Sequence, residues 1–302
     1  MVTPIIVSYS ELDTFRQCPL KHAILYGQRW TKPSKEGSAL EKGSLYHNVL
    51  EEHYRIIKEW QERFGGKRIP KRYHAEVLDA CRAAVQHWLY DPVTGEQTAT
   101  QELIEWMYDG YVEQYGVDDD WKILGVEHQI ITPLRYEHGR RSRYHLKAKM
   151  DLVIWHRQLG QRFVVDHKSG RDLPSSMDLE IDDQFGLYTW AMNEVGKPIT
   201  GTIHSANRTQ RNKSFMPLDT RMARTYLTRS PLELQNLALD AYRVARAAHP
   251  PKSEQRPPYS SPDPRSCGWK CDLKEAHLLM RQGRKMSEVL AEYGFKIDRT
   301  RH

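Results

Sequence analysis

The sequence predicts an α/β fold with a mixed central sheet flanked by helices. Three observations predict it: the first third of the chain has helical patterns, three segments rich in β-branched and aromatic residues follow, and a helix, a strand and a further helix come after them. A helix between strands favours a mixed α/β core. We expect one domain over residues 1–302, with a helical part at about 8–120 and the α/β core at about 121–248.

The helical part is expected to begin near Ser10, because an acid three residues later makes a variant of the capping box. A long amphipathic helix is expected at 40–64, since its apolar residues recur at helical spacing. His47 falls near the start of this helix. Two further helical patterns, at 74–90 and 102–115, complete the first third of the chain.

Strands and helices alternate in the core. Four strands are expected, at 122–132, 144–155, 162–170 and 199–207. The basic segment EHGRRSR between the first two is typical of a hairpin turn. Two helices are expected, at 179–195 and 233–248. The Pro- and Ser-rich segment 249–266 predicts a loop without regular structure, and residues 267–302 carry two cysteines and a last short helix.

Composition narrows the function classes. The net charge of +6 and the pI of about 9.0 suit a polyanionic partner, although many basic proteins bind no nucleic acid. No stretch approaches the roughly 20 apolar residues of a membrane span, and the first residues lack the basic and apolar regions of a signal peptide. We therefore expect a soluble, cytoplasmic protein.

Acidic and basic residues gather on two neighbouring strands. Asp151 lies on one strand, and the next ends in VVDHKSG, where Asp166 and Lys168 are two residues apart and so share a face, while His167 points away. A D-x-K pattern alone is more often a solvated edge or a salt bridge. Two carboxylates and a lysine on paired strands, however, are what metal-assisted phosphodiester hydrolysis requires.

Five motifs, in order along the chain, resemble the RecB-like branch of the PD-(D/E)XK nuclease superfamily. They are SYSELDTFRQCPLKH, GSLYHNVLE, LKAKMDLVIW, VVDHKSG and DDQFGLYTWAM. The match covers about residues 8–195, and the cysteine segment extends it to about 277. The chain is also similar to CRISPR-adaptation and AddB-type iron-sulfur exonucleases. The resemblance implies a restriction-endonuclease-like core with a helical N-terminal insertion and a C-terminal cysteine segment, encoded by a bacterium or a phage.

The resemblance also implies the roles of individual residues. His47, Asp151, Asp166 and the backbone carbonyl of His167 would bind Mg²⁺ or Mn²⁺, and Lys168 would be the catalytic lysine. Gln184 and Tyr188, one helical turn apart, would line the site and position the DNA strand or the lysine. Glu127 is a weaker candidate for a supporting acid, because nothing in the sequence decides whether it or its neighbour His128 faces the site.

The implied function is a metal-dependent DNA exonuclease acting on single-stranded DNA or DNA ends in recombination, repair or replication, in a bacterial or phage-infected cell. The alternatives are a structure-specific endonuclease and a non-catalytic nuclease-like partner of a helicase. The presence of His47, Asp151, Asp166 and Lys168 argues against the last, because a decayed site tolerates the loss of any one of them.

The resemblance further implies a [4Fe-4S] cluster bound by one cysteine near the N-terminus and three near the C-terminus. Cys18, Cys267 and Cys271 are three of these ligands, and His277 stands about where the fourth cysteine is expected. Three cysteines and a histidine also suit Zn²⁺, and a decayed site that binds nothing is the third alternative. Cys81 is interpreted as a small buried residue on a helix.

Overall fold

The computed structural model describes residues 3–211 and 217–298, except for the side chains of Trp269 and Lys270. It contains two compact units. Unit 1 comprises residues 1–34, 133–147 and 238–302, and unit 2 comprises residues 35–132 and 148–237. The expectation of a single domain remains a prediction. No helix among the described residues is long and apolar enough to cross a membrane.

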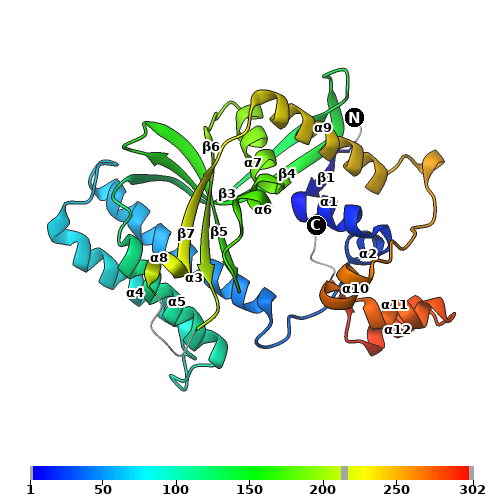
Figure 1. The fold of residues 1–302 in the computed structure, drawn as a ribbon, viewed down its shortest axis with the longest axis horizontal. Helices are drawn as coiled ribbons and strands as arrows, with labels where there is room; N and C mark the ends of the chain where they lie inside the picture. Colours follow the sequence, from blue (N-terminus) through cyan, green and yellow to red (C-terminus); the bar gives the residue numbers. More distant parts are fainter. Residues whose placement is uncertain (1–2, 212–216, 299–302) are drawn as a thin grey trace. The chain divides into compact units, whose positions relative to one another are not determined.

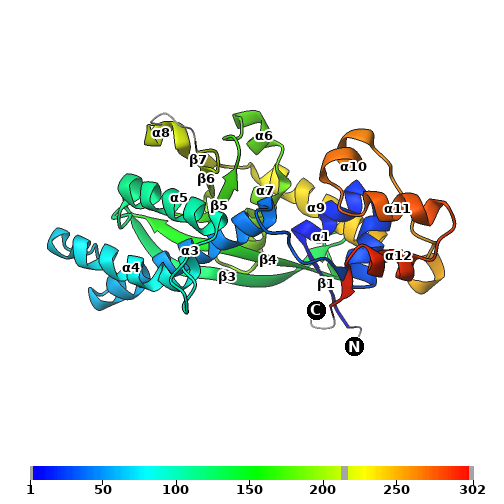
Figure 2. The same ribbon diagram turned by 90° about the horizontal axis from the view of Figure 1, so that it is seen from below.

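Three long helices form one side of unit 2 (Figures 1 and 2). They are α3 (Ala39–Arg63), α4 (His74–Leu89) and α5 (Ala99–Tyr115). A hydroxyl caps α3 and α5: Ser38 accepts a hydrogen bond from the Glu41 amide, and Thr98 accepts one from the Gln101 amide. The predicted helices at 40–64, 74–90 and 102–115 are therefore confirmed within a few residues.

The strands form a mixed sheet, as predicted. Among the described residues, five of its six strands are β3 (Trp121–Arg135), β4 (Arg141–His156), β5 (Gln161–Gly170), β6 (Gly201–Arg208) and β7 (Met222–Leu227). β4 runs antiparallel to β5, β5 parallel to β6, and β6 antiparallel to β7, while β3 pairs with β4. β7 was not predicted from the sequence. Phe163 and Val165 of β5 belong to the apolar core that α3, α4 and α5 complete.

The predicted helix at 179–195 is two helices. α6 (Ser176–Glu180) ends before Ile181, and α7 (Asp183–Glu194) begins after Asp182. The side chain of Asp182 accepts a hydrogen bond from the Gln184 amide, so this aspartate caps a new helix instead of continuing the first. Two more helices follow in the chain: α8 (Leu218–Arg221) and α9 (Pro231–Ala248).

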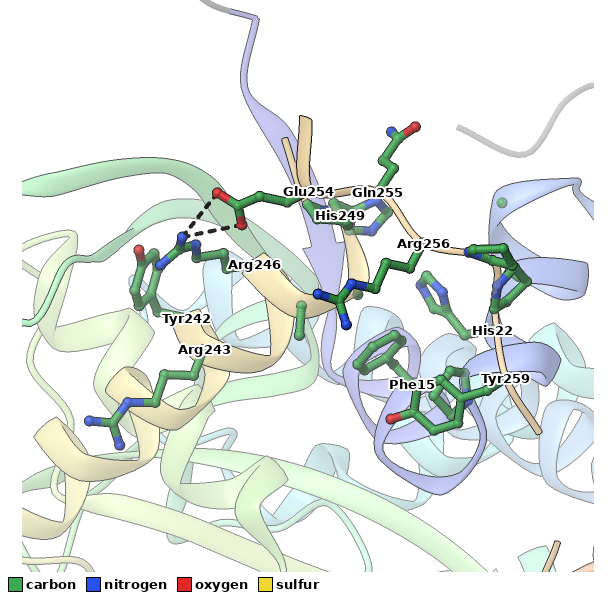
Figure 3. Close-up of a pocket in the computed structure, with 18 of the residues that line it drawn as sticks. Phe15, His22, Tyr242, Arg243, Arg246, His249, Glu254, Gln255, Arg256 and Tyr259 are labelled. Atoms are coloured by element: carbon green, nitrogen blue, oxygen red, sulfur yellow. Dashed lines mark hydrogen bonds and ion pairs between the residues drawn. The ribbon is translucent and has the colours of Figure 1, made fainter. Parts of the chain in front are cut away.

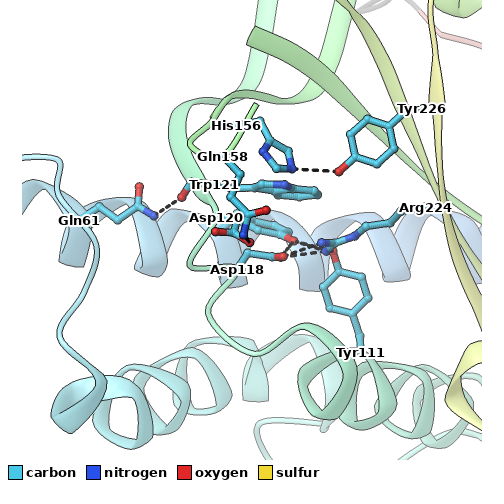
Figure 4. A network of polar contacts seen from close by, with 10 residues as sticks. Gln61, Tyr111, Asp118, Asp120, Trp121, His156, Gln158, Arg224 and Tyr226 are labelled. Carbon is cyan, nitrogen blue, oxygen red and sulfur yellow. Dashed lines mark hydrogen bonds and ion pairs between the residues drawn. The ribbon is translucent and has the colours of Figure 1, made fainter. Parts of the chain in front are cut away.

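A buried polar network supports the helical side of unit 2 (Figure 4). Arg224 of β7 lies 2.5 Å from an oxygen of Asp118 and donates a 2.8 Å hydrogen bond to the Tyr111 hydroxyl. Its guanidinium also stacks over Trp121, 3.9 Å from the ring centroid. Tyr54 donates a 2.5 Å hydrogen bond to Asp118. Because the buried charges are paired, the network fixes these aromatic rings in place.

Unit 1 contains the N-terminal helices. β1 (Ile5–Ser8) pairs in parallel with residues 144–147 of β4 and leads into α1 (Tyr9–Gln17) and α2 (Pro19–His22), followed by a π-helical turn at Ala23–Gly27. Ser8, not the predicted Ser10, caps α1: its backbone is extended and its side chain accepts from the Glu11 amide. Ser10 already lies in the first helical turn.

The C-terminal part of unit 1 is more regular than predicted. Three short helices lie there: α10 (Pro264–Lys270), α11 (Lys274–Arg281) and α12 (Met286–Glu292). The predicted loop at 249–266 contains a 3-10 turn at Lys252–Glu254, and Asp263 caps the start of α10 with hydrogen bonds to two amides. β2 (Trp30–Thr31) pairs antiparallel with β8 (Lys296–Ile297).

Candidate active site

Two paired strands bring the predicted acids together in unit 2. Leu152 of β4 pairs with Val165 of β5, so Asp151 and Asp166, one residue beyond that pair, are neighbours across the strands. The Lys168 ammonium lies 2.8 Å from Asp166 Oδ2. Asp166 and Lys168 therefore share one face of β5, as their spacing predicts.

His47 joins this group from helix α3. Its Nδ1 lies 3.3 Å from Asp151 Oδ2. One turn earlier on the same helix, a Cβ added at Gly43 would stand 3.8 Å from the Ser169 hydroxyl, so the start of α3 lies against the end of β5. The contact is ordinary, and the space alone does not require a glycine there.

Electrostatics separate the two aspartates. Burial raises the pKa of Asp151, but the hydrogen bond and charge of His47 outweigh it, and the net pKa is lowered. Burial dominates at Asp166, whose pKa is raised although the charge of Lys168 opposes the shift. Burial also lowers the pKa of His47, and the interaction with Asp151 more than reverses this. The site thus pairs one firmly ionised carboxylate with one more basic carboxylate.

The side chain of His167 points away from this group. Its backbone amide donates a 2.7 Å hydrogen bond to Asp151 Oδ2, while its ring stacks on Tyr54 at 5.6 Å between centroids. Neither ring nitrogen has a hydrogen-bond partner among the described residues, and burial lowers the pKa of the ring to about 3. The imidazole is therefore a neutral core group, and the role of the carbonyl as a metal ligand stays a prediction.

Helix α7 carries the remaining predicted pair. Gln184 Nε2 donates a 2.6 Å hydrogen bond to the Tyr188 hydroxyl. Burial raises the pKa of Tyr188, and the negative charge of Asp166 raises it further, which places the phenol within electrostatic reach of that carboxylate. Gln184 and Tyr188 therefore share one face of α7, as their spacing predicts.

An open hollow of about 390 Å³ adjoins the acids. Its lining includes His47, Asp151, Glu51, Glu127 and Lys149. Glu127 has a positive φ of 49° within β3 and forms an ion pair with Lys149, so it faces the site, a point that the sequence left open. Glu51 was not predicted from the sequence, although its position four residues after His47 on one helix is a signal that could have found it.

The donor set suits a divalent metal ion. Asp151 and Asp166 offer carboxylate oxygens, and His47 offers an imidazole nitrogen beside them. Asp166 Oδ2 is buried, and its partner among the described residues is the Lys168 ammonium at 2.8 Å.

The cysteine segment forms a separate pocket in unit 1. Cys18, Cys267, Cys271 and His277 line this pocket of about 270 Å³, which we call the cysteine pocket. Burial raises the pKa of Cys271, and Cys267 and Cys18 add to the shift, so the three thiols interact. All four cysteines are free thiols. The fourth, Cys81, is fully buried on α4, as predicted.

Asp151, Asp166, Lys168 and His47 thus meet at one place beside a mixed sheet, an arrangement that suits phosphodiester hydrolysis. The sequence model of the PD-(D/E)XK nuclease superfamily matches residues 6–276, and the chain belongs to this superfamily. PD-(D/E)XK nucleases generally use divalent metal ions such as Mg²⁺.

Two solved structures are similar to the chain. A candidate exonuclease from Eubacterium rectale is 15% identical, with a TM-score of 0.47, and the alignment covers 93% of this chain and 88% of that one. The protein SSO0001 is 13% identical, with a TM-score of 0.31, and the alignment covers 75% of this chain and 90% of that one. No curated protein matches the sequence.

Proposed function

We propose that the protein is a Mg²⁺- or Mn²⁺-dependent DNA exonuclease that processes single-stranded DNA or DNA ends in recombination, repair or replication. One observation carries the proposal: Asp151, Asp166 and His47 from three different elements converge beside Lys168. The preference for ends rather than internal sites is supported by the motif resemblance to RecB-like exonucleases.

In this proposal His47, Asp151, Asp166 and the His167 carbonyl hold the cation. A bound cation would polarise the scissile phosphate and lower the pKa of a water molecule. Asp151 is suited to a permanent anionic ligand, because its pKa is lowered and the His167 amide fixes its oxygen at 2.7 Å. The charge of Lys168 offsets negative charge that develops on the phosphate.

Gln184 and Tyr188 are proposed to orient the DNA strand or Lys168. Their 2.6 Å hydrogen bond fixes the phenol of Tyr188 on α7, where the charge of Asp166 acts on its pKa. The raised pKa of Tyr188 keeps its hydroxyl protonated at neutral pH, so it can donate a hydrogen bond to a phosphate or a water molecule. Glu127 forms an ion pair with Lys149 and lines the hollow, where we propose that it supports the bound cation.

Circular and linear DNA distinguish the proposal from its alternatives. The purified protein should degrade linear single-stranded DNA, or linear duplex from its ends, in Mg²⁺ or Mn²⁺, and should leave closed circles intact. Cleavage of circles would select a structure-specific endonuclease. No cleavage of any substrate, together with DNA binding, would select a non-catalytic partner of a helicase. Asp166→Asn is the variant expected to be inactive. Asp79→Asn, which changes an exposed acid on α4, is the matched control expected to stay active.

We further propose that Cys18, Cys267, Cys271 and His277 bind a [4Fe-4S] cluster. The four side chains line one pocket in unit 1, and the motif resemblance, which implies a cluster with ligands from both ends of the chain, favours this choice. Zn²⁺ is the alternative, because three thiolates and one imidazole also suit it.

A further inference from the structure

Three side chains that have no part in the proposed nuclease site converge in unit 1. Glu11 belongs to α1, His22 ends α2, and His249 directly follows α9. Nε2 of His22 lies 3.0 Å from Glu11 Oε1, and Nε2 of His249 lies 2.7 Å from the same oxygen. All three ligand atoms lie within 4.8 Å of one another. Two residues 238 positions apart in the sequence, Glu11 and His249, are therefore in direct contact.

The group is preorganised by its surroundings. Glu11 is 8% exposed and His22 is 4% exposed. The His22 ring is clamped between Phe15, at 5.3 Å edge to face, and Tyr26, at 5.5 Å in a stacked arrangement. Burial raises the pKa of Glu11, but hydrogen bonds from the two histidines outweigh it and lower the pKa to about 2. A buried, ionised carboxylate thus faces two imidazole nitrogens.

We propose that Glu11, His22 and His249 bind one divalent zinc-type metal ion. Two imidazoles and one carboxylate form a common three-ligand set for zinc, with a fourth position left to water or another ligand. At metal–ligand distances of about 2.0–2.2 Å, tetrahedral donor atoms stand roughly 3.4 Å apart. The spacings of 2.7 Å and 3.0 Å are shorter than this by roughly 0.7 Å and 0.4 Å, so side-chain rotations that open the group by these amounts would create the site.

The fourth position has an access route. His22 and His249 line a cavity of about 990 Å³, shown in Figure 3. Arg243 and Arg246 also line it, but each is paired with an acid, Glu137 and Glu254 respectively. The local positive charge is thereby partly neutralised, which reduces the repulsion that a divalent cation would meet. Water from the cavity can complete the coordination.

Binding would have a structural consequence. The metal would join α1 and α2 to the end of α9 and so close a loop of 238 residues. Closing a long loop in the folded state stabilises it relative to the unfolded chain. The site is chemically distinct from the cysteine pocket: Cys18 and His22 are four residues apart, but only His22 joins the Glu11 group.

The test compares zinc content and stability in four proteins. Wild type, Glu11→Gln, His249→Ala and His138→Ala are treated with chelator, loaded with Zn²⁺ alone, desalted and analysed for zinc per chain. His138 is the matched control, because it is an exposed histidine that lines the same cavity outside the Glu11 group. We expect Glu11→Gln and His249→Ala to bind one zinc fewer than wild type and His138→Ala.

Zinc should also raise the melting temperature of wild type and His138→Ala more than that of the other two variants. The X-ray absorption spectra of zinc-loaded wild type and His249→Ala should then be compared. The zinc present only in wild type should show nitrogen and oxygen neighbours at about 2.0–2.2 Å, whereas zinc in the cysteine pocket would show sulfur at about 2.3 Å. Cooperative melting after chelator treatment checks that the variants fold.

Equal zinc content and equal zinc-dependent stabilisation in all four proteins would overturn the proposal and leave the group as a hydrogen-bonded cluster. That result would not bear on the nuclease proposal, because the variants keep Asp151, Asp166 and Lys168 unchanged.

Discussion

His47 Nδ1 lies 3.3 Å from Asp151 Oδ2, which connects the long helix α3 to strand β4 at the candidate active site. The contact shifts both groups toward their charged forms, since the pKa of Asp151 is lowered and that of His47 is raised. A cation that replaced the proton on the imidazole would keep the same attraction to the carboxylate. The pair therefore has the properties expected of two ligands of one metal ion.

Replacing Asp151 should abolish cleavage without unfolding the protein. Asp151→Asn keeps the size of the side chain and can still accept the hydrogen bond from the His167 amide, but it removes the anionic ligand. We expect the rate of DNA cleavage to fall by at least about 100-fold, as for loss of a group that stabilises the transition state. Melting temperature checks the fold, and Asp79→Asn should cleave like wild type. A wild-type rate in Asp151→Asn would remove it from the site.

The charge of Lys168 should matter more than its length. Lys168→Met should lower the cleavage rate by at least about 100-fold, because the ammonium beside Asp166 is lost. Lys168→Arg keeps the charge and should retain part of the activity. Lys197→Met, an exposed lysine outside the site, is the control. Equal activity of the Met and Arg variants would contradict an electrostatic role.

Cleavage should depend on a divalent metal ion. EDTA should silence the enzyme, and added Mg²⁺ or Mn²⁺ should restore it, because the proposed ligands are two carboxylates and one imidazole. Ca²⁺ is a useful comparison, since it binds oxygen ligands with looser geometry. Activity that persists after chelation and dialysis into metal-free buffer would contradict the metal-dependent mechanism.

Much of the fold could be predicted because its local patterns are strong. The apolar periodicity of α3 and the β-branched residues of β5 each point to one structure. β1 was missed because it has only four residues and pairs with a strand far along the chain. β7 was missed because it contains Arg224, whose burial depends on an acid that the fold brings from residue 118.

In the candidate sites too, features with a local sequence pattern could be predicted and features that depend on distant residues could not. Alternation along a strand places Asp166 and Lys168 on one face, but only the motif resemblance connects them to His47 and Asp151. The orientation of Glu127 could not be predicted, because its positive φ breaks the alternation of β3. The Glu11 group could not be predicted either, since residues separated by 238 positions carry no local signal. The catalytic and cluster roles remain predictions.

The stability of the protein should fall between pH 6.5 and pH 4 because of buried histidines. Burial lowers the pKa of His53 from 6.5 to about 4, so in the folded state it stays neutral over this range. The unfolded chain binds a proton there and is favoured as the pH falls. The difference corresponds to about 3 kcal/mol of unfolding free energy.

His53→Gln tests this pH dependence, because glutamine does not titrate and can still bond to the Tyr108 hydroxyl, 3.0 Å from His53 Nδ1. Urea unfolding from pH 7.5 to pH 4 should show a shallower loss of stability in this variant than in wild type. His138→Gln, an exposed histidine, should follow wild type. Parallel pH profiles of stability for wild type and His53→Gln would show that His53 does not cause this pH dependence.

The cysteine pocket should yield a brown protein after anaerobic purification. Thiolate-bound iron gives this colour, and elemental analysis should find about four irons per chain if Cys18, Cys267, Cys271 and His277 hold a [4Fe-4S] cluster. Cys267→Ala should lose both the colour and the iron, and should melt at a lower temperature because the cluster joins segments from both ends of the sequence. Cys81→Ala is the control, since this cysteine is buried in unit 2, and it should keep the cluster. His277→Cys should keep the cluster as well, because it restores the thiolate that the family resemblance leads us to expect.

Zinc without iron in the wild-type protein, lost in Cys267→Ala, would show that the pocket is a zinc site instead of a cluster site. A protein that contained neither iron nor zinc would show that the pocket binds no metal. The nuclease proposal would still stand on Asp151, Asp166 and Lys168.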